Sequence, residues 1–583
     1  MLASRVRSLG LAFAIALGFL LATRQLGCNA YSGNSAHRAQ VDAFLSGRLA
    51  LSPSPDALAH DLAWTPSGVQ QVWGLGVAMW QTPFELVARV VGQDPFPDRI
   101  ALLVFLALAW FVLLRAFHRA DEPWWIGAGS ALITGLLPAV IAMVRGRMGV
   151  YEETALYAYA AALILLGGLV VFARGPTRNR YLVLLLLAGA TGLIRPTVWF
   201  YGVGTAVLAT AIYVRAHGRR MLPIVALGTA LFVAGGATLY ATNAARFGAG
   251  TEFGHRLNLE ALPGNVVATR FSYPFERTGY LDAATELAGS LFGLPTTSKR
   301  GFYARDLHVG QSSTVRWREY YFTTFSWPYL PLLLAGLVLT VLAWRRKSDE
   351  RWLGTWAVIG GLPIAVFYLH SPSISSRYEL DLAPAIAALL VVTWRATAAW
   401  AIARKRGAIA ADVLGALWLA AVLTSHARSR VATDLVDRTT AATARAALSR
   451  PPSRSHDLPS VYDLADPKLE SYLDDDGKPP ELYLNGSGWD RATGRVAPAA
   501  HLFMTDPAFV EVEVEPADAQ VQIAIGREHL TLASREPTPG GARLRFTLPS
   551  PMPGLQVAFL AFGPDTALDL PYTPIVLRRV RWR

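Results

Sequence analysis

The sequence predicts an α-helical polytopic membrane protein with a C-terminal all-β domain, and three observations support this fold class. Of 583 residues, 52% are hydrophobic and 16% are charged, whereas soluble globular domains carry about 25% charged residues. Apolar runs long enough to cross a bilayer recur through residues 1–428. Short runs that alternate apolar and polar residues follow within 461–583, as is typical of β-strands. The composition excludes an ordinary soluble enzyme and a disordered chain.

The apolar runs predict about eleven membrane-spanning helices. We interpret the first run as an uncleaved helix, because many spans follow it; a cleaved signal peptide and a lipoprotein signal ending at Cys28 are the alternatives. Arg195-Pro196 interrupts a stretch that is too long for one helix, and it predicts a hairpin because proline disfavours helix in the residue before it. The runs lie near 9–22, 99–117, 124–144, 155–173, 181–194, 198–214, 221–241, 329–344, 352–369, 382–403 and 408–425.

The basic residues predict how the helices are oriented. The formal net charge is +12, and the arginines gather in short clusters between apolar runs, which is typical of the cytoplasmic side of a membrane protein. This pattern argues against nucleic acid as a partner. It predicts a multi-pass protein of a bacterial inner membrane with a cytoplasmic N-terminus, two large outer loops (24–98 and 243–328) and a periplasmic C-terminal domain. The clusters lie near 115–119, 174–180, 215–220, 345–347 and 404–406.

The predicted domain organisation has three parts. A transmembrane domain covers 1–428, a helical linker covers 429–460, and an extracytoplasmic β-sandwich covers 461–583. Pro451-Pro452 indicates a linker. Alternating runs such as 510–514, separated by turn residues, predict six or seven antiparallel strands in the last part, about the number in a small sandwich.

A loop in the C-terminal domain is a candidate sugar-binding site. Asn485, Trp489 and Asp490 lie close together. They combine an aromatic face, which stacks on sugar rings, with amide and carboxylate groups that bind hydroxyls. The alternative is a tight turn with a core tryptophan.

The sequence lacks the motifs of several kinds of enzyme chemistry. The glycine pairs at 74–76 and 202–204 do not extend to a dinucleotide-binding fingerprint, and the sequence has no P-loop and no H-E-x-x-H zinc motif. It also has no G-x-S-x-G nucleophile elbow. Cys28 is the sole cysteine, which excludes an intramolecular disulfide, an iron–sulfur cluster and a thiolate zinc site. No cofactor is therefore expected, apart from a divalent metal ion (Mg²⁺ or Mn²⁺), which stays open.

Carboxylates and arginines near the predicted outer face are the remaining candidates for chemistry. Ionisable groups at membrane depth are costly and usually functional. The structural alternative is interfacial anchoring together with local ion pairs. The candidate catalytic residues are Asp42, Asp61, Glu152 and Glu153; the candidate phosphate-binding residues are Arg195, Arg377 and Tyr378; Glu252, His255 and Arg318 are candidate acceptor or loop residues.

Several short segments give the chain a family resemblance. They are Asn34…Arg38, Ser46-Gly47-Arg48-Leu49, His60-Asp61-Leu62-Ala63-Trp64, Leu193-Ile194-Arg195-Pro196-Thr197, Asn243…Arg246-Phe247-Gly248 with Glu252-Phe253-Gly254-His255, and Ser376-Arg377-Tyr378-Glu379-Leu380-Asp381. Over roughly residues 1–405 the chain resembles the GT-C superfamily of polytopic glycosyltransferases, in the group of protein mannosyltransferases and aminoarabinose transferases. Within that group, the chain resembles an uncharacterised bacterial branch.

The resemblance implies a sugar donor linked to polyprenyl phosphate and a catalytic acidic residue in the first outer loop. Many members carry an Asp-Glu pair directly after the first helix, where this chain has Tyr31-Ser32-Gly33-Asn34-Ser35. The similarity of pattern then assigns the acid to Asp61. A degenerate member without catalytic activity stays open.

The resulting hypothesis is an inverting transfer to a hydroxyl acceptor of the cell envelope. Asp61 would act as general base. Glu152 or Glu153 would orient the acceptor, or bind a divalent metal together with Asp61. Arg195 and Arg377 would stabilise the departing lipid phosphate. The rival hypotheses are a transporter or lipid flippase, and a catalytically dead membrane protein that binds glycan.

Overall fold

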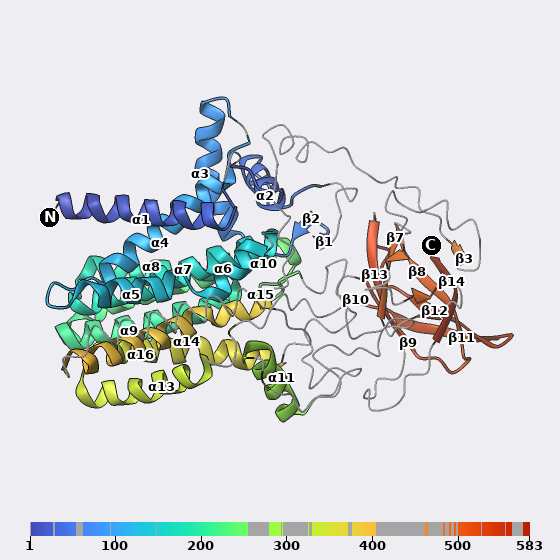
Figure 1. Cartoon of the computed structure of the whole chain (residues 1–583). Coiled ribbons are helices and arrows are strands. Elements are labelled where there is room, and N and C mark those ends of the chain that lie inside the picture. The colour runs from blue at the N-terminus through green and yellow to red at the C-terminus, as the bar shows by residue number, and fades with distance from the viewer. Residues whose placement is uncertain are drawn as a thin grey trace.

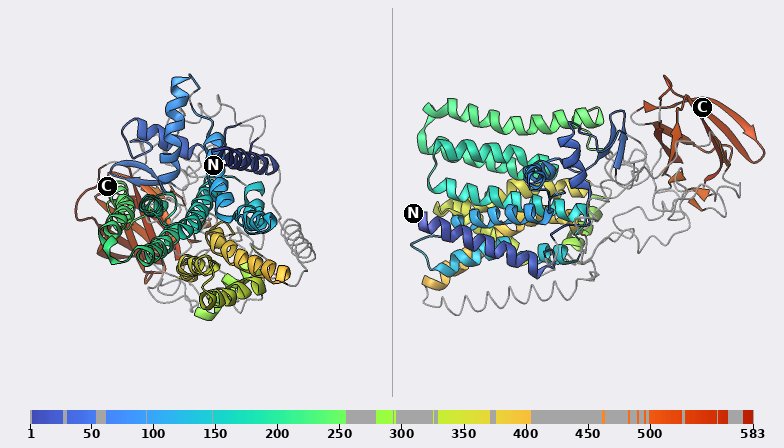
Figure 2. Two further views of the ribbon diagram at one scale, coloured as in Figure 1. Left: turned by 90° about the vertical axis from the view of Figure 1, so that its left-hand side faces the viewer. Right: turned by 90° about the horizontal axis from the view of Figure 1, so that it is seen from above.

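The computed structural model is mostly helical, with a β-sheet region in the C-terminal part (Figure 1). The helical part lies in one bundle, and the strands lie beyond the end of the bundle opposite the N-terminus (Figures 1 and 2). The structure describes residues 2–26, 30–53, 62–93, 95–146, 148–254, 279–292, 294, 325, 329–370, 376–403, 461–463, 482–483, 489–490, 495–496, 499–525, 528–553, 555–562 and 575–582.

Long apolar helices packed side by side form the bundle (Figure 2). Within the described residues, seven helices are long and apolar enough to cross a membrane, or eight if the bent pair α5 and α6 is one span. The prediction of about eleven spans is not settled by this number, because 408–425 lies outside the description and α1 has only a shorter apolar stretch, Val6–Ala22. The helices are α1 (Leu2–Ala22), α4 (Asp98–Phe117), α5 (Trp124–Gly135), α6 (Pro138–Gly146), α7 (Val150–Arg174), α8 (Arg178–Ile194), α9 (Trp199–His217), α10 (Leu222–Phe247), α13 (Tyr329–Arg346), α14 (Glu350–His370) and α16 (Ala383–Ala403).

Helix α7 is at the centre of the bundle and α10 is at its edge. In the most apolar stretch of each helix, 78% of α7 is buried inside the protein but only 6% of α10. Gly189 of α8 and Gly235 of α10 let these two helices approach closely: a Cβ atom on Gly235 would lie 2.3 Å from the Gly189 backbone. Small residues at such contacts are a common means of helix association in membranes. The predicted hairpin is confirmed, since α8 ends at Ile194 and α9 begins at Trp199.

The predicted outer loops contain short elements at the end of the bundle nearest the strands (Figure 1). We call this the outer end, following the predicted orientation, and the opposite one the inner end. Helix α2 is short, and α3 projects sideways with exposed apolar residues such as Val87 and Val90. An amphipathic helix of this kind is suited to the plane of the membrane interface. The elements are α2 (Ala36–Leu45), β1 (Leu62–Thr65), β2 (Gly68–Gln71), α3 (Gly76–Val90), α11 (Tyr280–Phe292) and α15 (Ser376–Glu379).

Two antiparallel sheets form the C-terminal part. Within the described residues one sheet has the order β10-β9-β13-β7-β4, and the other has the order β11-β12-β8-β14-β6-β5, with β3 also paired to β14. The predicted alternation is confirmed in β8, where Val510, Val512 and Val514 are buried in an apolar cluster that both sheets share. The domain boundaries stay predictions, and the predicted helical linker 429–460 lies outside the described residues.

The strands of this part vary from two to eight residues. They are β3 (Val461–Asp463), β4 (Leu482–Tyr483), β5 (Trp489–Asp490), β6 (Arg495–Val496), β7 (Ala499–Thr505), β8 (Phe509–Glu515), β9 (Val521–Ile525), β10 (Glu528–His529), β11 (Thr531–Thr538), β12 (Gly541–Thr547), β13 (Leu555–Phe562) and β14 (Ile575–Trp582).

Candidate active site

Five of the predicted site residues lie at the outer end of the bundle. Glu152 and Glu153 are in the first turn of α7, Arg195 directly follows α8, and Arg377 and Tyr378 are in α15. Contacts described below connect them to three further residues. We call the set Arg38, Asp98, Glu152, Glu153, Arg195, Arg377, Tyr378 and Asp381 the outer polar band.

The first part of the band is a buried ion pair between α2 and α4. Arg38 Nη1 lies 3.0 Å from Asp98 Oδ1, and the exposed fractions of the two side chains are 1% and 3%. The backbone N–H of Ser32 donates to Asp98 Oδ1 at 2.9 Å, and Arg38 Nη2 donates to the Ser32 carbonyl oxygen at 2.9 Å. These hydrogen bonds offset part of the cost of burying the two charges. They also fix the chain that follows α1 against the start of α4.

The second part of the band is the start of α7. The Glu152 carboxylate accepts a hydrogen bond from the Gly149 N–H at 3.0 Å, which caps the helix, and its Oε1 lies 3.7 Å from Arg377 Nη1. Glu153 is also buried, and its Oε2 accepts a hydrogen bond from Asn34 Nδ2 at 3.3 Å. Among the described residues, Glu153 is the carboxylate of the band that forms no ion pair, and its Oε1 has no hydrogen-bond partner there. Glu153 therefore differs from the other carboxylates of the band, each of which is held by an arginine.

Arg377 and Tyr378 connect the two halves of the band. The Arg377 guanidinium lies over the Tyr151 ring at 4.1 Å and near the Tyr378 ring at 5.2 Å. The Arg195 guanidinium lies 5.7 Å from the same ring. Cation–π contacts within about 6 Å are favourable, more so away from water. The tyrosine thus holds two arginines in one region.

The last part of the band is the ion pair of Arg195 with Asp381. Arg195 Nε lies 2.8 Å from Asp381 Oδ1. Thr197 Oγ1 and Tyr368 OH each donate to Asp381 Oδ2 at 2.6 Å. These contacts with Asp381 use the Nε side of the guanidinium, and 15% of the Arg195 side chain is exposed. Asp381 therefore orients the arginine through its Nε.

Two other predicted residues lie apart from these contacts. Asp42 is 52% exposed and pairs with Arg89 Nη2 of α3 at 3.0 Å. Glu252 accepts hydrogen bonds from the N–H groups of Phe253 and Gly254, and Gly254 has a φ of +82°, so the carboxylate stabilises a turn. Asp61, His255, Arg318 and Asn485 lie outside the described residues, and only the backbone of Trp489 and Asp490 is described, in β5.

The structure adds residues that the sequence did not single out. Asp98 opens α4 at the edge of the apolar run 99–117, and its position at the outer end of a span was the signal that could have identified it. His37 lies beside the band: its Nε2 is 3.1 Å from Thr154 Oγ1. Burial lowers the pKa of His37 to about 4, with Arg38 acting in the same direction and Asp98 opposing it. The imidazole is therefore neutral at physiological pH.

Metal binding is not supported within the described part of the chain. No three His, Cys, Asp or Glu side chains gather there in a way that could hold a metal ion. The metal ligand set suggested by the sequence includes Asp61, which is not among the described residues.

Comparison with known proteins gives a weak structural likeness. No protein-family model and no curated protein matches the chain. Among solved structures, it is similar to the arabinosyltransferase EmbB from Mycobacterium smegmatis, with 14% sequence identity and a TM-score of 0.31. The match covers 98% of this chain and 64% of the EmbB chain, so this chain spans less than two thirds of that protein. A likeness with so low a TM-score does not establish the fold or the activity of this chain.

Proposed function

We propose that the chain is a membrane glycosyltransferase that moves a sugar from a polyprenyl-phosphate donor to a hydroxyl acceptor at the outer face. The observation that carries this proposal is the outer polar band. Its carboxylates and arginines converge from α4, α7, α15 and the α8–α9 turn, and most of them are buried. Buried ionisable groups at the ends of spanning helices are expensive, and they usually serve a substrate.

The arginines suit the leaving group. A polyprenyl phosphate gains negative charge as the glycosidic bond breaks, and preorganised cations stabilise that charge in the transition state. Asp381 orients Arg195 through Nε, and an arginine held in this way is suited to bind phosphate oxygens. Arg377 lies near the same tyrosine ring as Arg195, and the two are proposed to bind one phosphate.

The carboxylates suit the acceptor. Asp61 is proposed as the general base that takes the proton from the acceptor hydroxyl, so that the oxygen attacks the anomeric carbon as the bond to phosphate breaks. Glu153 is proposed to orient that hydroxyl, because its Oε1 has no partner in the described part of the chain. Glu152 binds the Gly149 N–H and Arg377, which fits a positioning role. A Mg²⁺ or Mn²⁺ ion is part of the proposal only with Asp61 as one of its ligands.

The acceptor and the C-terminal domain complete the proposal. A hydroxyl of a cell-envelope lipid, glycan or protein is the proposed acceptor. The β-sheet region lies beyond the outer end of the bundle (Figure 1). Asn485, Trp489 and Asp490 are proposed to bind the glycan there.

The test is product formation by the purified full-length protein in proteoliposomes. A panel of undecaprenyl-phosphate-linked radiolabelled pentoses and hexoses is supplied with a cell-envelope extract as acceptor. The wild type is expected to form labelled product with one donor, and Asp61→Asn to lower the rate by about 10²–10⁴. Glu528→Gln, at an exposed carboxylate of β10, is the matched control.

Three outcomes would contradict parts of the proposal. Transfer by Asp61→Asn at the wild-type rate would remove the base assignment. Labelled donor that crosses the bilayer without product would identify a transporter instead. Glycan binding without product from any donor would identify a catalytically dead member.

A further inference from the structure

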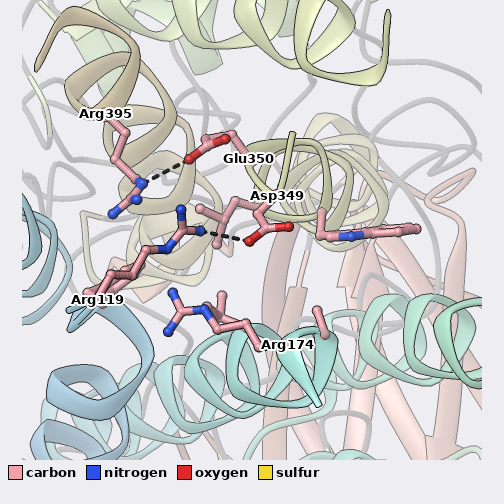
Figure 3. A pocket seen from close by; sticks show the side chains of 10 residues that line it. Arg119, Arg174, Asp349, Glu350 and Arg395 are labelled. Atoms are coloured by element: carbon pink, nitrogen blue, oxygen red, sulfur yellow. Dashed lines mark hydrogen bonds and ion pairs between the residues drawn. The ribbon is translucent and has the colours of Figure 1, made fainter. Parts of the chain in front are cut away.

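A pocket at the inner end of the bundle contains charged groups that the proposed transfer does not use. Three arginines extend into it from different elements: Arg119 from the loop after α4, Arg174 from the end of α7 and Arg395 from α16 (Figure 3). Asp349 and Glu350 line the same pocket. It lies at the opposite ends of the helices that form the outer polar band, so it is a separate site.

The arginines differ in how they are paired. Arg119 donates to Glu122 at 2.9 Å and to Asp349 at 2.8 Å, and Arg395 donates to Glu350 at 2.9 Å and to Glu122. Arg174 forms no ion pair with a described residue, and its hydrogen bond to the His118 carbonyl oxygen is 3.4 Å long. The pocket thus holds one cation that is not bound to a carboxylate.

Arg395 supplies a second, independent observation, a buried N–H donor in this pocket. Its side chain is only 5% exposed, and its Nη1 has no hydrogen-bond partner in the described part of the chain. Figure 3 shows its guanidinium directed toward Arg119 and Arg174. A buried N–H without a partner is costly, and a ligand oxygen at this position would remove the cost.

The pocket offers charges of both signs to a ligand. Three arginines and two carboxylates line it, so a zwitterionic ligand can contact both kinds of charge where a simple anion contacts only the arginines. Asp349 is 50% exposed and Glu350 is 19% exposed. Both can therefore accept hydrogen bonds from an ammonium group, while Arg174 and Arg395 bind a phosphate. Phosphoethanolamine carries these two charges a few bonds apart.

The walls of the pocket favour a lipid as the source of this group. Phe117, Val170, Trp352 and Leu353 line it beside the charged residues. The Arg351 guanidinium lies 4.7 Å from the Trp352 ring, and Trp344 packs edge-on against Trp352 at 5.2 Å. Tryptophans and arginines gathered at the end of a span are typical of headgroup depth. Basic pockets between spans on the cytoplasmic side bind lipid headgroups.

From these contacts we infer that the inner pocket binds the headgroup of phosphatidylethanolamine. Its phosphate contacts Arg174 and Arg395 Nη1, and its ammonium contacts Asp349 and Glu350. The choline headgroup has no N–H to donate, so phosphatidylcholine lacks the second set of contacts. The inference does not depend on the proposed transferase activity.

Native mass spectrometry of the detergent-purified full-length protein tests the inference, with each lipid titrated separately. The wild type is expected to bind phosphatidylethanolamine at least about tenfold more tightly than phosphatidylcholine, the usual value of one or two hydrogen bonds to charged groups. Arg174→Gln should weaken phosphatidylethanolamine binding by about tenfold, and Arg174→Lys should weaken it less. Asp349→Asn should reduce the preference over phosphatidylcholine. Arg215→Gln, at an exposed arginine in the last turn of α9, should bind as the wild type does.

Three results would overturn the inference. Equal binding of the two lipids by the wild type would mean that the ammonium group does not contact Asp349 and Glu350. This comparison uses only the wild-type protein, so it does not depend on whether a variant folds. Unchanged binding by a folded Arg174→Gln protein would remove the phosphate contact. Free O-phosphoethanolamine that binds as tightly as the lipid would exclude a membrane source.

Discussion

The charged side chains at the two ends of the bundle differ in how far they are exposed, although some of the same helices contribute residues to both ends. Helix α7 has Glu152 and Glu153 in its first turn and Arg174 in its last. At the outer end, the ion pairs Arg38–Asp98 and Arg377–Glu152 join side chains that are at most 8% exposed. At the inner end, Arg395 is as deeply buried, at 5% exposed, but its partner Glu350 is 19% exposed and Asp349 is 50% exposed.

This difference in exposure indicates different uses. Charges removed from water are costly unless hydrogen bonds hold them in place, and groups held in this way are suited to a reaction that needs fixed geometry. Charges that keep contact with water can exchange partners at little cost. The outer end is therefore the better candidate for catalysis, and the inner end the better candidate for a ligand that comes and goes.

The largest expected effect concerns Glu153. Glu153→Gln keeps the shape of the side chain but removes the charge that would orient an acceptor hydroxyl, and transfer should fall by about 10²-fold. The proteoliposome assay measures this rate, with Glu528→Gln as the control for a carboxylate lost elsewhere. A rate within a few fold of the wild type would mean that Glu153 does not face the acceptor.

A second large effect concerns the stability of the outer end. Asp98→Asn leaves Arg38 charged, buried and without its partner, which should lower the free energy of unfolding by about 3–5 kcal/mol. Thermal unfolding in detergent, followed by fluorescence, measures the loss. A change below about 1 kcal/mol would indicate that water reaches this pair and that the two ends do not differ as described.

His37 should make the outer end sensitive to acid. Burial lowers the pKa of His37 from 6.5 to about 4, so the unfolded chain binds this proton more readily than the folded one. The stability from neutral His37 is present above pH 6.5 and is lost as the pH falls from 6.5 toward 4, by up to about 3 kcal/mol. His37→Gln should flatten this part of the stability profile. Parallel profiles for the two proteins would contradict the prediction.

The smallest expected effect separates Asp42 from the buried pair. Asp42 is 52% exposed in its pair with Arg89, and surface ion pairs contribute about 0–1 kcal/mol. Asp42→Asn should therefore change the unfolding free energy by less than about 1 kcal/mol in the same assay. A loss like that of Asp98→Asn would place Asp42 in the fixed network.

The features of the fold that depend on a local sequence pattern could be predicted. The break at Arg195-Pro196 and the inward valines of β8 follow from proline chemistry and residue spacing alone. The band is different, because it joins residues far apart in the sequence. Asp381 follows Arg195 by 186 positions, and Arg38 meets Asp98 across the ends of two helices. Hydropathy places such groups at an outer end but cannot say which two meet.

The position of β14 in its sheet has a consequence for biosynthesis. This strand pairs with β8, β6 and β3, and its Val580 and Trp582 are buried in the core that both sheets share. It also follows every other described strand in the chain. The domain therefore cannot close until residues 575–582 have been synthesised. A chain stalled before this point would leave the edges of β8 and β3 without their partner strand, whereas the helices of the bundle would already be complete.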